Sequence, residues 1–596
     1  MGTFENDKEF DKYLEEIKKT QEDKDKQTAD GLGGLGDLST TEESASPKSE
    51  GEESITNVQE QGVDEGDIVK VYKDYFVILR RGRIFTVKIS DGNALKAISH
   101  INAYPEGYTQ GTWYDEMLIY QDKIVVIGYS YDMEATEIGL FSINDSGELK
   151  HLSHYFIDSN DYYSSRNYAS RLIDNQLILY MPYYLYSYDY FGEEYKQELT
   201  FPKIYKWVKG DELSEGKDIL QKTDIYKPVQ DIDTPTLHTV VSCDIASSEL
   251  DCSGKAVMGP YSRNFYVSPN AIYLWVSDIN YYYYDDEELD KIKNEPDSYV
   301  YMIKLDDMSA RALRADAGPT DQFSFKEEDN YLNVLVREYS GSDAMWNPEV
   351  TEGALALFRV PLDKFTDTPE VISQEYYQDL PNISGYTLQN RFVGDYVLYG
   401  TGSTWYYDEK SEDKLYLKKY TEESEAERLD LQHGVERIDI MGKNAVIIGN
   451  KDENLKFSSI DLSDIKVKDT YDVGRAAQGE LRSHGFSYKD NKDGTGILGL
   501  PIIRTGESFE HLFSASAEIL FLKANQDLSF AKLGTLKGSA PREENDNCEY
   551  SCVDWYGNSR PIFYSDRIFG LMGYELLEGE LKAEEITEKG KVNFTP

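Results

Sequence analysis

From about residue 55 to its end, the chain alternates short apolar runs with polar turns. One unit recurs, in which a strand-like run, a two-residue polar turn and a second strand-like run follow one another. This order is typical of a β-hairpin. The turns are Lys73-Asp74, Gln121-Asp122, Asp174-Asn175, Pro269-Asn270, Asp329-Asn330, Gly394-Asp395, Gly442-Lys443, Asp493-Gly494 and Ser565-Asp566.

Nine hairpins with no convincing helix between them form an internal repeat of about 50 residues. A repeat of three or four antiparallel strands predicts an all-β fold, a closed β-propeller, because radial closure hides the edges that an open sheet would expose. If the first and last hairpins share a blade, nine hairpins make eight blades. We favour eight, with seven and nine open, and a pair of β-sandwiches is the alternative architecture.

The N-terminus follows a different pattern. Phe10, Leu14 and Ile17 lie at helical spacing, with Asn6 as a plausible N-cap, so a short helix is predicted. The Gly-, Ser- and Glu-rich sequence that follows cannot bury enough apolar surface to offset the entropy of ordering it. The predicted organisation is a helical lead segment at 1–30, a disordered linker at 31–55 and the propeller at 56–596.

The repeat region opens with TNVQEQGVDEGDIVK at residues 56–70. This resembles the TNVQ…GVDEADIVK-type signature of secreted β-propeller proteins of bacteria and archaea, a family distantly related to WD40 repeats. Gly66 stands where that family has Ala, and Ser483-His484-Gly485 replaces an Asp-His-Lys-like triplet. Other segments similar to strands of the family are residues 321–327, 390–395, 483–486, 500–502 and 559–564.

The resemblance implies a propeller and an exported location, and it implies no activity. The first residues lack the basic and apolar regions of a signal peptide, and no apolar run is long enough to span a membrane. We therefore expect a secreted or cell-surface protein whose signal peptide has been removed, with a cytosolic protein as the alternative.

The charge balance restricts the possible partners. The chain has 109 Asp and Glu against 62 Lys and Arg, a formal net charge of −47. Nucleic acid requires a basic footprint, so this balance argues against nucleic-acid binding, and equally against docking on anionic lipid. It suits solubility and cation binding.

The four cysteines form two local pairs in polar sequence, Cys243 with Cys252 and Cys548 with Cys552. Local pairing would give two disulfides, and an even count of paired cysteines favours an oxidising compartment. Free thiols and a zinc site remain alternatives, although the spacings are not CxxC and no histidine lies nearby.

Few residues suggest catalysis. No HExxH, GxSxG, P-loop or GxGxxG motif occurs in a supporting context. His151 and His154 are three residues apart in a predicted strand, which would place them on opposite faces. His433 and His484 each precede a glycine near the start of a blade, where they would face the channel or serve a structural role. We predict no catalytic residue.

Carboxylates and tyrosines provide the remaining candidates. Asp64, Glu65 and Asp67 lie at the entry of the first strand and could hold Ca²⁺, which prefers oxygen ligands, or they could be turn formers. Tyrosine offers a rigid contact surface with a polar tip, so Tyr-rich loops predict a recognition surface, with local packing as the alternative. The candidate binding residues are Tyr183, Tyr184, Tyr186, Tyr281, Tyr282, Tyr283, Tyr284 and Trp405.

The function predicted from these features is that of an exported, non-enzymatic binding or scaffold module. Its expected partner is a protein or a surface polysaccharide, with self-assembly possible and Ca²⁺ as the one candidate cofactor. The alternatives are a glycan- or peptide-cleaving hydrolase with a site at the channel mouth, and a structural subunit of a surface assembly or filament.

Overall fold

The structure of the protein is a computed structural model, and its described part contains one α-helix, five short 3-10 helices and strands in nine sheets. The described residues are 2–25, 55–90, 94–108, 111–160, 170–185, 201–228, 235–247, 249–260, 262–277, 298–341, 350–384, 387–402, 412–504, 518–539, 546–554 and 557–596.

The first three sheets contain the strands before residue 260. Sheet 1 consists of β2 (Val69–Tyr72), β3 (Tyr75–Arg80), β4 (Arg83–Lys88) and β5 (Lys96–Asn102). Sheet 2 consists of β6 (Thr112–Tyr120), β7 (Lys123–Ser130), β8 (Ala135–Ile143) and β9 (Leu149–Asp158), extended outward by β12 (Lys203–Lys209), β13 (Glu212–Leu213) and β14 (Lys217–Asp218). Sheet 3 consists of β1 (Asp64–Glu65), β10 (Ser170–Ile173), β11 (Gln176–Tyr184), β16 (Thr236–Asp244), β17 (Asp251–Gly259) and β15 (Ile225–Tyr226).

Sheets 4 to 6 follow in chain order. Sheet 4 consists of β18 (Ser262–Val267), β19 (Ala271–Ser277), β20 (Ser298–Lys304) and β21 (Ala310–Ala315). Sheet 5 consists of β22 (Gly318–Pro319), β23 (Phe325–Glu328), β24 (Tyr331–Gly341), β25 (Val350–Pro361) and β26 (Tyr377–Leu380). Sheet 6 consists of β27 (Thr387–Val393), β28 (Tyr396–Gly402), β29 (Lys414–Lys419) and β30 (Glu427–Asp430).

Sheets 7 to 9 complete the chain. Sheet 7 consists of β31 (Arg437–Met441), β32 (Asn444–Lys451), β33 (Asn454–Asp461) and β34 (Lys466–Val473). Sheet 8 consists of β35 (Ala476–Gln478), β36 (Ser487–Asp490), β37 (Gly496–Arg504), β38 (Glu518–Ala524) and β39 (Phe530–Lys537). Sheet 9 consists of β40 (Ser559–Tyr564), β41 (Arg567–Met572), β42 (Glu575–Lys582) and β43 (Glu585–Asn593). The 3-10 helices are η1 (Lys222–Asp224), η2 (Gln322–Ser324), η3 (Leu362–Lys364), η4 (Gln374–Tyr376) and η5 (Ser483–Gly485).

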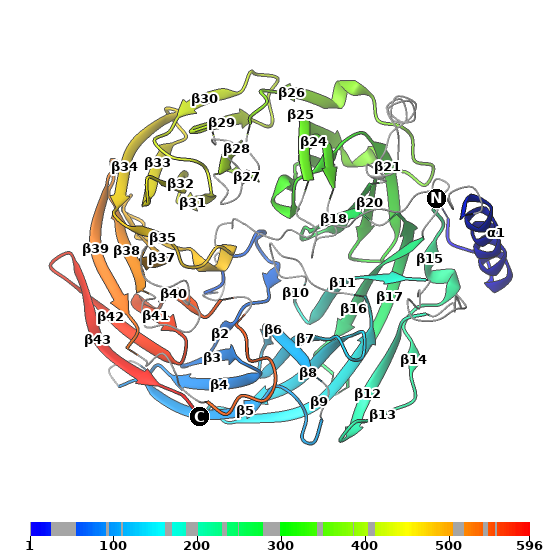
Figure 1. The fold of residues 1–596 in the computed structure, drawn as a ribbon, viewed down its shortest axis with the longest axis horizontal. Coiled ribbons are helices and arrows are strands. Elements are labelled where there is room, and N and C mark those ends of the chain that lie inside the picture. Colours follow the sequence, from blue (N-terminus) through cyan, green and yellow to red (C-terminus); the bar gives the residue numbers. More distant parts are fainter. Residues whose placement is uncertain are drawn as a thin grey trace.

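The sheets follow one another around a common centre, with their first strands innermost (Figure 1). Each predicted hairpin turn joins two paired strands of a single sheet, as Lys73-Asp74 joins β2 to β3. The hypothesis that the first and last hairpins share a blade is therefore wrong, because they lie in sheets 1 and 9. Nine sheets fall at the upper end of the predicted range of seven to nine.

Sheets 1 and 9 meet through side chains, since no strand pairing joins them in the described part of the chain. Phe76 and Phe85 of sheet 1 belong to one buried cluster with Phe569 and Leu571 of sheet 9. Phe76 and Phe569 pack edge to face, with ring centroids 5.0 Å apart. Apolar packing thus joins the two ends of the array, where we expected a shared sheet.

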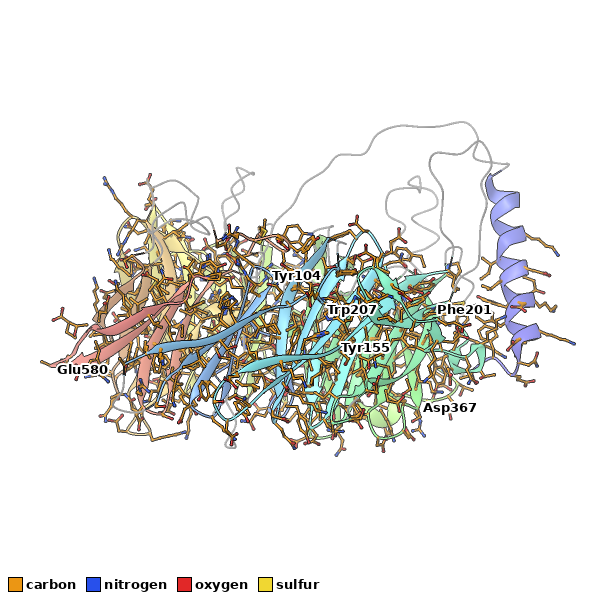
Figure 2. All side chains as sticks on the ribbon, turned by 90° about the horizontal axis from the view of Figure 1, so that it is seen from below. Tyr104, Tyr155, Phe201, Trp207, Asp367 and Glu580 are labelled. Carbon is orange, nitrogen blue, oxygen red and sulfur yellow. A yellow bond between two sulfur atoms is a disulfide. The ribbon has the colours of Figure 1, made fainter. Side chains whose placement is uncertain are left out.

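The disc has two different faces. We call the face that carries the nine predicted hairpin turns the turn face, where turns of neighbouring sheets contact each other, as Lys73 and Asp145 do at 2.6 Å. Because the strands alternate in direction, the strand that follows each of these hairpin turns ends on the opposite face, which we call the loop face. Figure 2 shows the disc from the side, with Tyr104 toward the loop face and Asp367 toward the turn face.

The predicted N-terminal helix is confirmed as α1 (Asp7–Asp25). Phe10, Leu14 and Ile17 are buried against the rim of the disc, near β15 (Figure 1). The side chain of Asn6 caps the helix by accepting a hydrogen bond from the N–H of Glu9 at 3.2 Å. No helix in the described residues is both long and apolar enough to cross a membrane.

Both predicted disulfides are present. Cys243 in β16 and Cys252 in β17 are register partners and are bonded to each other. Cys548 is bonded to Cys552 in the connection between sheets 8 and 9. The spacing of the cysteines and their polar surroundings therefore gave the correct pairing.

Candidate functional site

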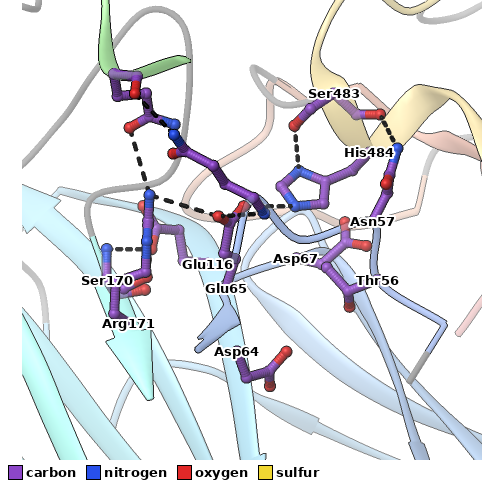
Figure 3. A network of polar contacts seen from close by, with 12 residues as sticks. Thr56, Asn57, Asp64, Glu65, Asp67, Glu116, Ser170, Arg171, Ser483 and His484 are labelled. Atoms are coloured by element: carbon purple, nitrogen blue, oxygen red, sulfur yellow. Dashed lines mark hydrogen bonds and ion pairs between the residues drawn. The ribbon is translucent and has the colours of Figure 1, made fainter. Parts of the chain in front are cut away.

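The family-like signature lies at the centre of the disc. We call residues 56–67 the axial segment, and Figure 3 shows its contacts. Within it, β1 pairs with β10 of sheet 3, and Asp67 forms a backbone bridge with Met117 of sheet 2. Further along, the side-chain amide of Asn57 donates to the carbonyls of Ser483 and Phe486 at 3.4 and 3.3 Å. A single segment thus contacts sheets that are far apart in the sequence.

Glu65 is the most enclosed carboxylate of the axial segment. Its Oε1 lies 3.7 Å from Nη2 of Arg171, and its Oε2 lies 3.3 Å from Nε2 of His484. The backbone N–H of Gln59 donates to the same carboxylate at 3.0 Å. Burial opposes ionisation of Glu65, but Arg171, His484 and this hydrogen bond outweigh it and lower its pKa to about 2. Glu65 is therefore an anion at neutral pH.

Asp64 and Asp67 have different cationic partners. Asp67 Oδ1 lies 3.0 Å from Nε of Arg560 in sheet 9, and Asp64 Oδ1 lies 2.8 Å from Nζ of Lys70 in sheet 1. The same Lys70 ammonium donates to Thr56 Oγ1 at 2.9 Å. The three carboxylates are thus each bound to a separate cation of the protein.

This arrangement does not resemble a calcium cage, in which several oxygen atoms converge on one point. Among the described residues, no group of three or more His, Cys, Asp or Glu side chains is placed to hold a metal ion. Calcium binding by Asp64, Glu65 and Asp67 stays a prediction, while the observed geometry gives them a different role, which is to hold the axial segment against the surrounding sheets.

Gly66 explains one departure from the family signature. A Cβ atom at this position would lie 2.7 Å from Oε2 of Glu116 and 3.0 Å from Oγ of Ser170. Glu116 is buried and accepts a hydrogen bond from the N–H of Ser170 at 3.2 Å. An alanine at position 66 would therefore require the Glu116 side chain to move.

Buried arginines of the inner strands are the part of the site that sequence reasoning missed. Arg171 and Arg560 bind the axial segment, and Arg391 and Arg437 are also buried. Two of these arginines follow a serine at the start of an inner strand, as Ser170-Arg171 and Ser559-Arg560. The recurrence of Arg just after a hairpin repeat begins was the signal available in the sequence.

A second charged pair lies deeper in sheet 7. Arg437 Nη1 is 3.4 Å from Asp439 Oδ2, and its guanidinium also donates to the Glu480 carbonyl at 2.9 Å. Burial raises the pKa of Asp439 to about 6, against the lowering effect of Arg437 and Arg391. Burial likewise lowers the pKa of Arg391 to about 10. The opposite charges of these groups neutralise one another inside the protein, so we assign them a structural role.

The histidines are partly placed as predicted. His484 does lie at the centre, against Glu65, whereas His433 contacts Ser458 Oγ at 2.8 Å within sheet 7. The prediction that His151 and His154 lie on opposite faces is wrong. Their ring centroids are 5.6 Å apart, because a register shift in the pairing of β8 with β9 places one extra residue between them.

His154 is completely buried and contacts the carboxylate of Glu137, which also accepts a hydrogen bond from the hydroxyl of Tyr114. Burial raises the pKa of Tyr114 well above its ordinary value. This cluster lies inside sheet 2, where all three side chains are out of reach of a substrate in solution.

Only part of the predicted tyrosine surface can be located. Tyr183 and Tyr184 are half-buried at the end of β11, on the loop face. The N–H of Tyr184 is bound to the side-chain oxygen of Asn160. Tyr186, Tyr281, Tyr282, Tyr283, Tyr284 and Trp405 lie outside the described residues.

Two clefts of about 650 and 660 Å³ open on the turn face between sheets 4 and 5. They share Pro269, Asn270 and Glu327. Glu327 accepts hydrogen bonds from the Asn270 side chain at 2.8 Å and from the Tyr273 hydroxyl at 2.9 Å. No histidine or cysteine is among the described residues that line these clefts, so their lining offers polar contacts without a nucleophile–base pair.

A family model for the beta propeller domain matches residues 53–363, just over half of the chain. The chain belongs to this beta propeller domain family. The matched region includes the axial segment and sheets 1 to 4, so the nine sheets are those of a propeller-family protein. No curated protein gives a significant match.

Two solved structures are similar to this beta propeller protein. Apo AztD from Citrobacter koseri is 9% identical with a TM-score of 0.33, over 89% of this chain and 94% of that chain. A structure from an analysis of two prolyl endopeptidases is 10% identical with a TM-score of 0.31, over 74% of this chain and 55% of that chain. The present chain thus spans little more than half of that structure, and neither similarity bears on function.

Proposed function

We propose that this beta propeller protein is an exported, non-enzymatic binding or scaffold module that presents its loop face to a partner. Its frame is a closed ring in which each of the nine sheets is one blade. The packing of Phe76 against Phe569 between the first and last sheets supports closure. The two disulfides support export, because such bonds persist in oxidising compartments.

The observation that carries the proposal is the difference between the two faces. On the turn face, the nine hairpin turns are short and mostly polar, such as Gly394-Asp395. On the loop face, five of the strands that follow a hairpin turn lead into longer connections, and these strands end at Tyr184, Ser277, Gly341, Gly402 and Arg504. Long connections on a rigid frame are where binding residues concentrate in proteins.

The composition of these connections favours recognition. Tyr183 and Tyr184 end β11, and the sequences that follow β11, β19 and β28 contain the other tyrosines and Trp405 predicted above as a binding surface. Aromatic side chains with polar tips suit contacts to a protein surface or to the faces of sugar rings. We therefore propose a protein or a surface polysaccharide as the partner.

The axial segment supports a binding module over a hydrolase. The carboxylates at the centre are bound to Arg171, Lys70 and Arg560. A general acid or base must reach a proton of its substrate, and these carboxylates already contact cations of the protein. The alternative of a hydrolase with a site at the channel mouth would need residues other than these.

The test is retention of partners from the envelope fraction and the purified surface polysaccharides of the producing cells. We expect the double variant Tyr183→Ser/Tyr184→Ser to lose the retained partner. Tyr396→Ser, which replaces a half-buried tyrosine on the turn face, should retain it. Equal loss in both variants, or cleavage of the offered peptides or glycans, would contradict the proposal.

Calcium at Asp64, Glu65 and Asp67 remains a separate proposal. An ion there would have to compete with Lys70 and Arg560, so binding should be weak. The test compares melting temperatures in low-millimolar calcium and in sodium chloride of matched ionic strength. An excess stabilisation by calcium that is absent in Asp64→Asn/Asp67→Asn would support the site, and no excess in the wild type would refute it.

A further inference from the structure

The N-terminal residues add to the edge of a sheet at the rim. Thr3 forms an antiparallel bridge with Tyr226 of β15, which is the outermost strand of sheet 3. The N–H of Phe4 donates to the carbonyl of Ile225 at 3.2 Å, and the N–H of Lys227 donates to the carbonyl of Gly2 at 3.0 Å. The chain thus covers its own sheet edge by strand addition.

The helix that follows buries an apolar stripe in the same place. Phe10, Leu14 and Ile17 of the helix, together with Phe4 just before it, are each less than a tenth exposed and belong to the core cluster that contains Ile225. The rings of Phe10 and Phe201 are 5.4 Å apart. Burial of four large apolar side chains contributes on the order of several kcal/mol. The segment is therefore firmly docked on the rim.

Charge complementarity sets the register of this docking. Lys222 Nζ lies 2.5 Å from Asp11 Oδ1, and Lys227 Nζ lies 2.5 Å from Glu9 Oε1. Both lysines also lie over phenylalanine rings, Lys222 over Phe10 at 5.6 Å and Lys227 over Phe4 at 5.6 Å. Such half-exposed pairs add little affinity. They do select an acidic segment, on a protein that is strongly acidic overall.

We infer that residues 2–25 are an exchangeable docking segment, and that the rim groove around β15 also accepts this segment from a second copy of the chain. Each of these contacts joins the segment to the groove, and residues 26–54, which connect the segment to the propeller, have the composition of a linker. Because each copy has one groove and one segment, two copies can exchange their segments reciprocally, or several copies can dock head to tail.

Concentration decides between the two arrangements. A linker of this kind gives an effective concentration of roughly millimolar for docking on the same chain. Docking on the same chain therefore dominates in dilute solution. Exchange becomes comparable where copies are packed at about millimolar concentration, as on a crowded surface. This inference concerns the rim and is independent of the binding role proposed for the loop face.

The first experiment asks whose segment fills the groove. Equal amounts of unlabelled and ¹⁵N-labelled full-length protein are mixed at concentrations from micromolar to about 1 mM and treated with a zero-length carbodiimide. This reagent joins Asp11 to Lys222 and Glu9 to Lys227. We expect peptide pairs of mixed label to rise with concentration, toward half of all such pairs. Only same-label pairs at every concentration would overturn the inference.

A second experiment measures docking of a separate segment. A fluorescent peptide of residues 2–25 is titrated with the full-length Phe10→Ser variant, whose own segment has lost a buried ring. The control is full-length Lys12→Ser, altered on the exposed side of the helix. We expect at least tenfold tighter peptide binding by Phe10→Ser than by Lys12→Ser. Equal binding, or undiminished binding of a peptide that itself carries Phe10→Ser, would show that the groove does not recognise this segment.

Discussion

The interfaces between neighbouring sheets and the centre of the ring are built from opposite chemistry. Between sheets 1 and 9, Phe85 and Leu571 are fully buried among apolar side chains. At the centre, equally buried positions hold Glu65, Asp67 and Arg560. The faces of neighbouring sheets lie close together, so apolar side chains fill the space between them. The inner strands instead surround a central space, and the axial segment occupies it.

This difference has a structural reason. The nine sheets are arranged around a common centre, and the axial segment lies in that centre. That segment brings backbone groups and carboxylates, which must be satisfied once they are buried. Arginine suits this task, because the N–H groups of its guanidinium can bind a carboxylate and several carbonyls at once. The stability of the centre therefore depends on matched charges, whereas the stability of the interfaces between sheets depends on the packing of apolar side chains.

The sharpest test of this contrast removes one charge from the centre. Arg560 binds both Asp67, at 3.0 Å, and Glu480, at 3.2 Å. Arg560→Leu leaves two buried carboxylates without this partner, so we expect a loss of about 3–5 kcal/mol in the free energy of unfolding. Arg428→Leu, which breaks an exposed pair with Asp430, should cost at most about 1 kcal/mol. Urea titration of both variants measures the difference, and similar midpoints would contradict a charge-dependent centre.

Truncation of an apolar side chain at the interface between sheets 1 and 9, which we call the seam, tests the other region. Leu571→Ala removes a buried side chain between sheets 9 and 1, and we expect a loss of about 2–5 kcal/mol. Leu581 lies in the same sheet and is 44% exposed, so Leu581→Ala should change stability by less than about 1 kcal/mol. Thermal unfolding by circular dichroism gives both values. A tolerated Leu571→Ala would mean that this interface does not hold the ring together.

Comparing the two disulfides distinguishes two ways in which such a bond can stabilise the protein. One is support of the contacts across the seam, and the other is the general effect of a cross-link on the unfolded chain. Cys548–Cys552 lies in residues 546–554, where Asp546 contacts Arg83 of sheet 1 at 2.7 Å and Asp554 contacts Arg80 at 3.3 Å. Loop entropy alone predicts that the longer loop, Cys243–Cys252, stabilises more.

Because only the shorter disulfide supports contacts across the seam, we expect the reverse order. Cys548→Ser/Cys552→Ser should lose about 2 kcal/mol or more, and Cys243→Ser/Cys252→Ser should lose less. Differential scanning calorimetry under non-reducing conditions compares the two. A larger loss in the Cys243/Cys252 variant would favour the entropic explanation.

As the pH falls, we expect the protein to lose stability first through its buried neutral histidines and only later through the ion pairs of the centre. Burial lowers the pKa of His433 to about 4 and that of His238 to about 3. Below pH 6.5 the unfolded chain binds protons at these positions while the folded chain does not, so stability falls as the pH decreases from 6.5 toward 4. Glu65, with its pKa near 2, loses its contribution only below about pH 4.5.

Asp439 acts in the opposite direction, because its raised pKa favours the folded state at low pH and partly offsets the histidines. We expect His433→Gln to reduce the loss of stability between pH 7 and pH 5 by about 2 kcal/mol. His238→Gln should reduce that loss as well, because burial also lowers the pKa of His238. Melting temperatures of the three proteins across this range provide the measurement, and identical pH profiles would refute the assignment.

The sequence predicted the repeating fold well because hairpin signals are local. Turn pairs such as Asp174-Asn175 need a left-handed residue, which Asp174 adopts with φ of 51°. The spacing of Cys548 and Cys552 is equally local, and its pairing was predicted correctly. The sharing of one blade by the first and last hairpins was predicted wrongly, because whether the two ends of the chain pair in one sheet depends on how all the sheets meet, and no local pattern encodes that.

The centre was predicted only in part. The signature around Glu65 marked the right place, and its suggestion of calcium stays a prediction. It did not reveal the partners of Glu65 and Asp67, because Arg171 and Arg560 lie roughly a hundred and nearly five hundred positions away in the sequence. The face of His151 was misjudged for a different reason, since a bulge changes the alternation of a strand without changing its apolar pattern.

Hydrogen exchange of the axial segment tests the central claim most directly, namely that this segment is a structural part of the ring. Peptides that cover residues 56–67 should exchange as slowly as those from β28 and β32, and far more slowly than the exposed turn at residues 421–425. In Arg560→Leu, the protection of residues 56–67 should fall while that of β28 stays. Rapid exchange of residues 56–67 in the wild-type protein would contradict the account.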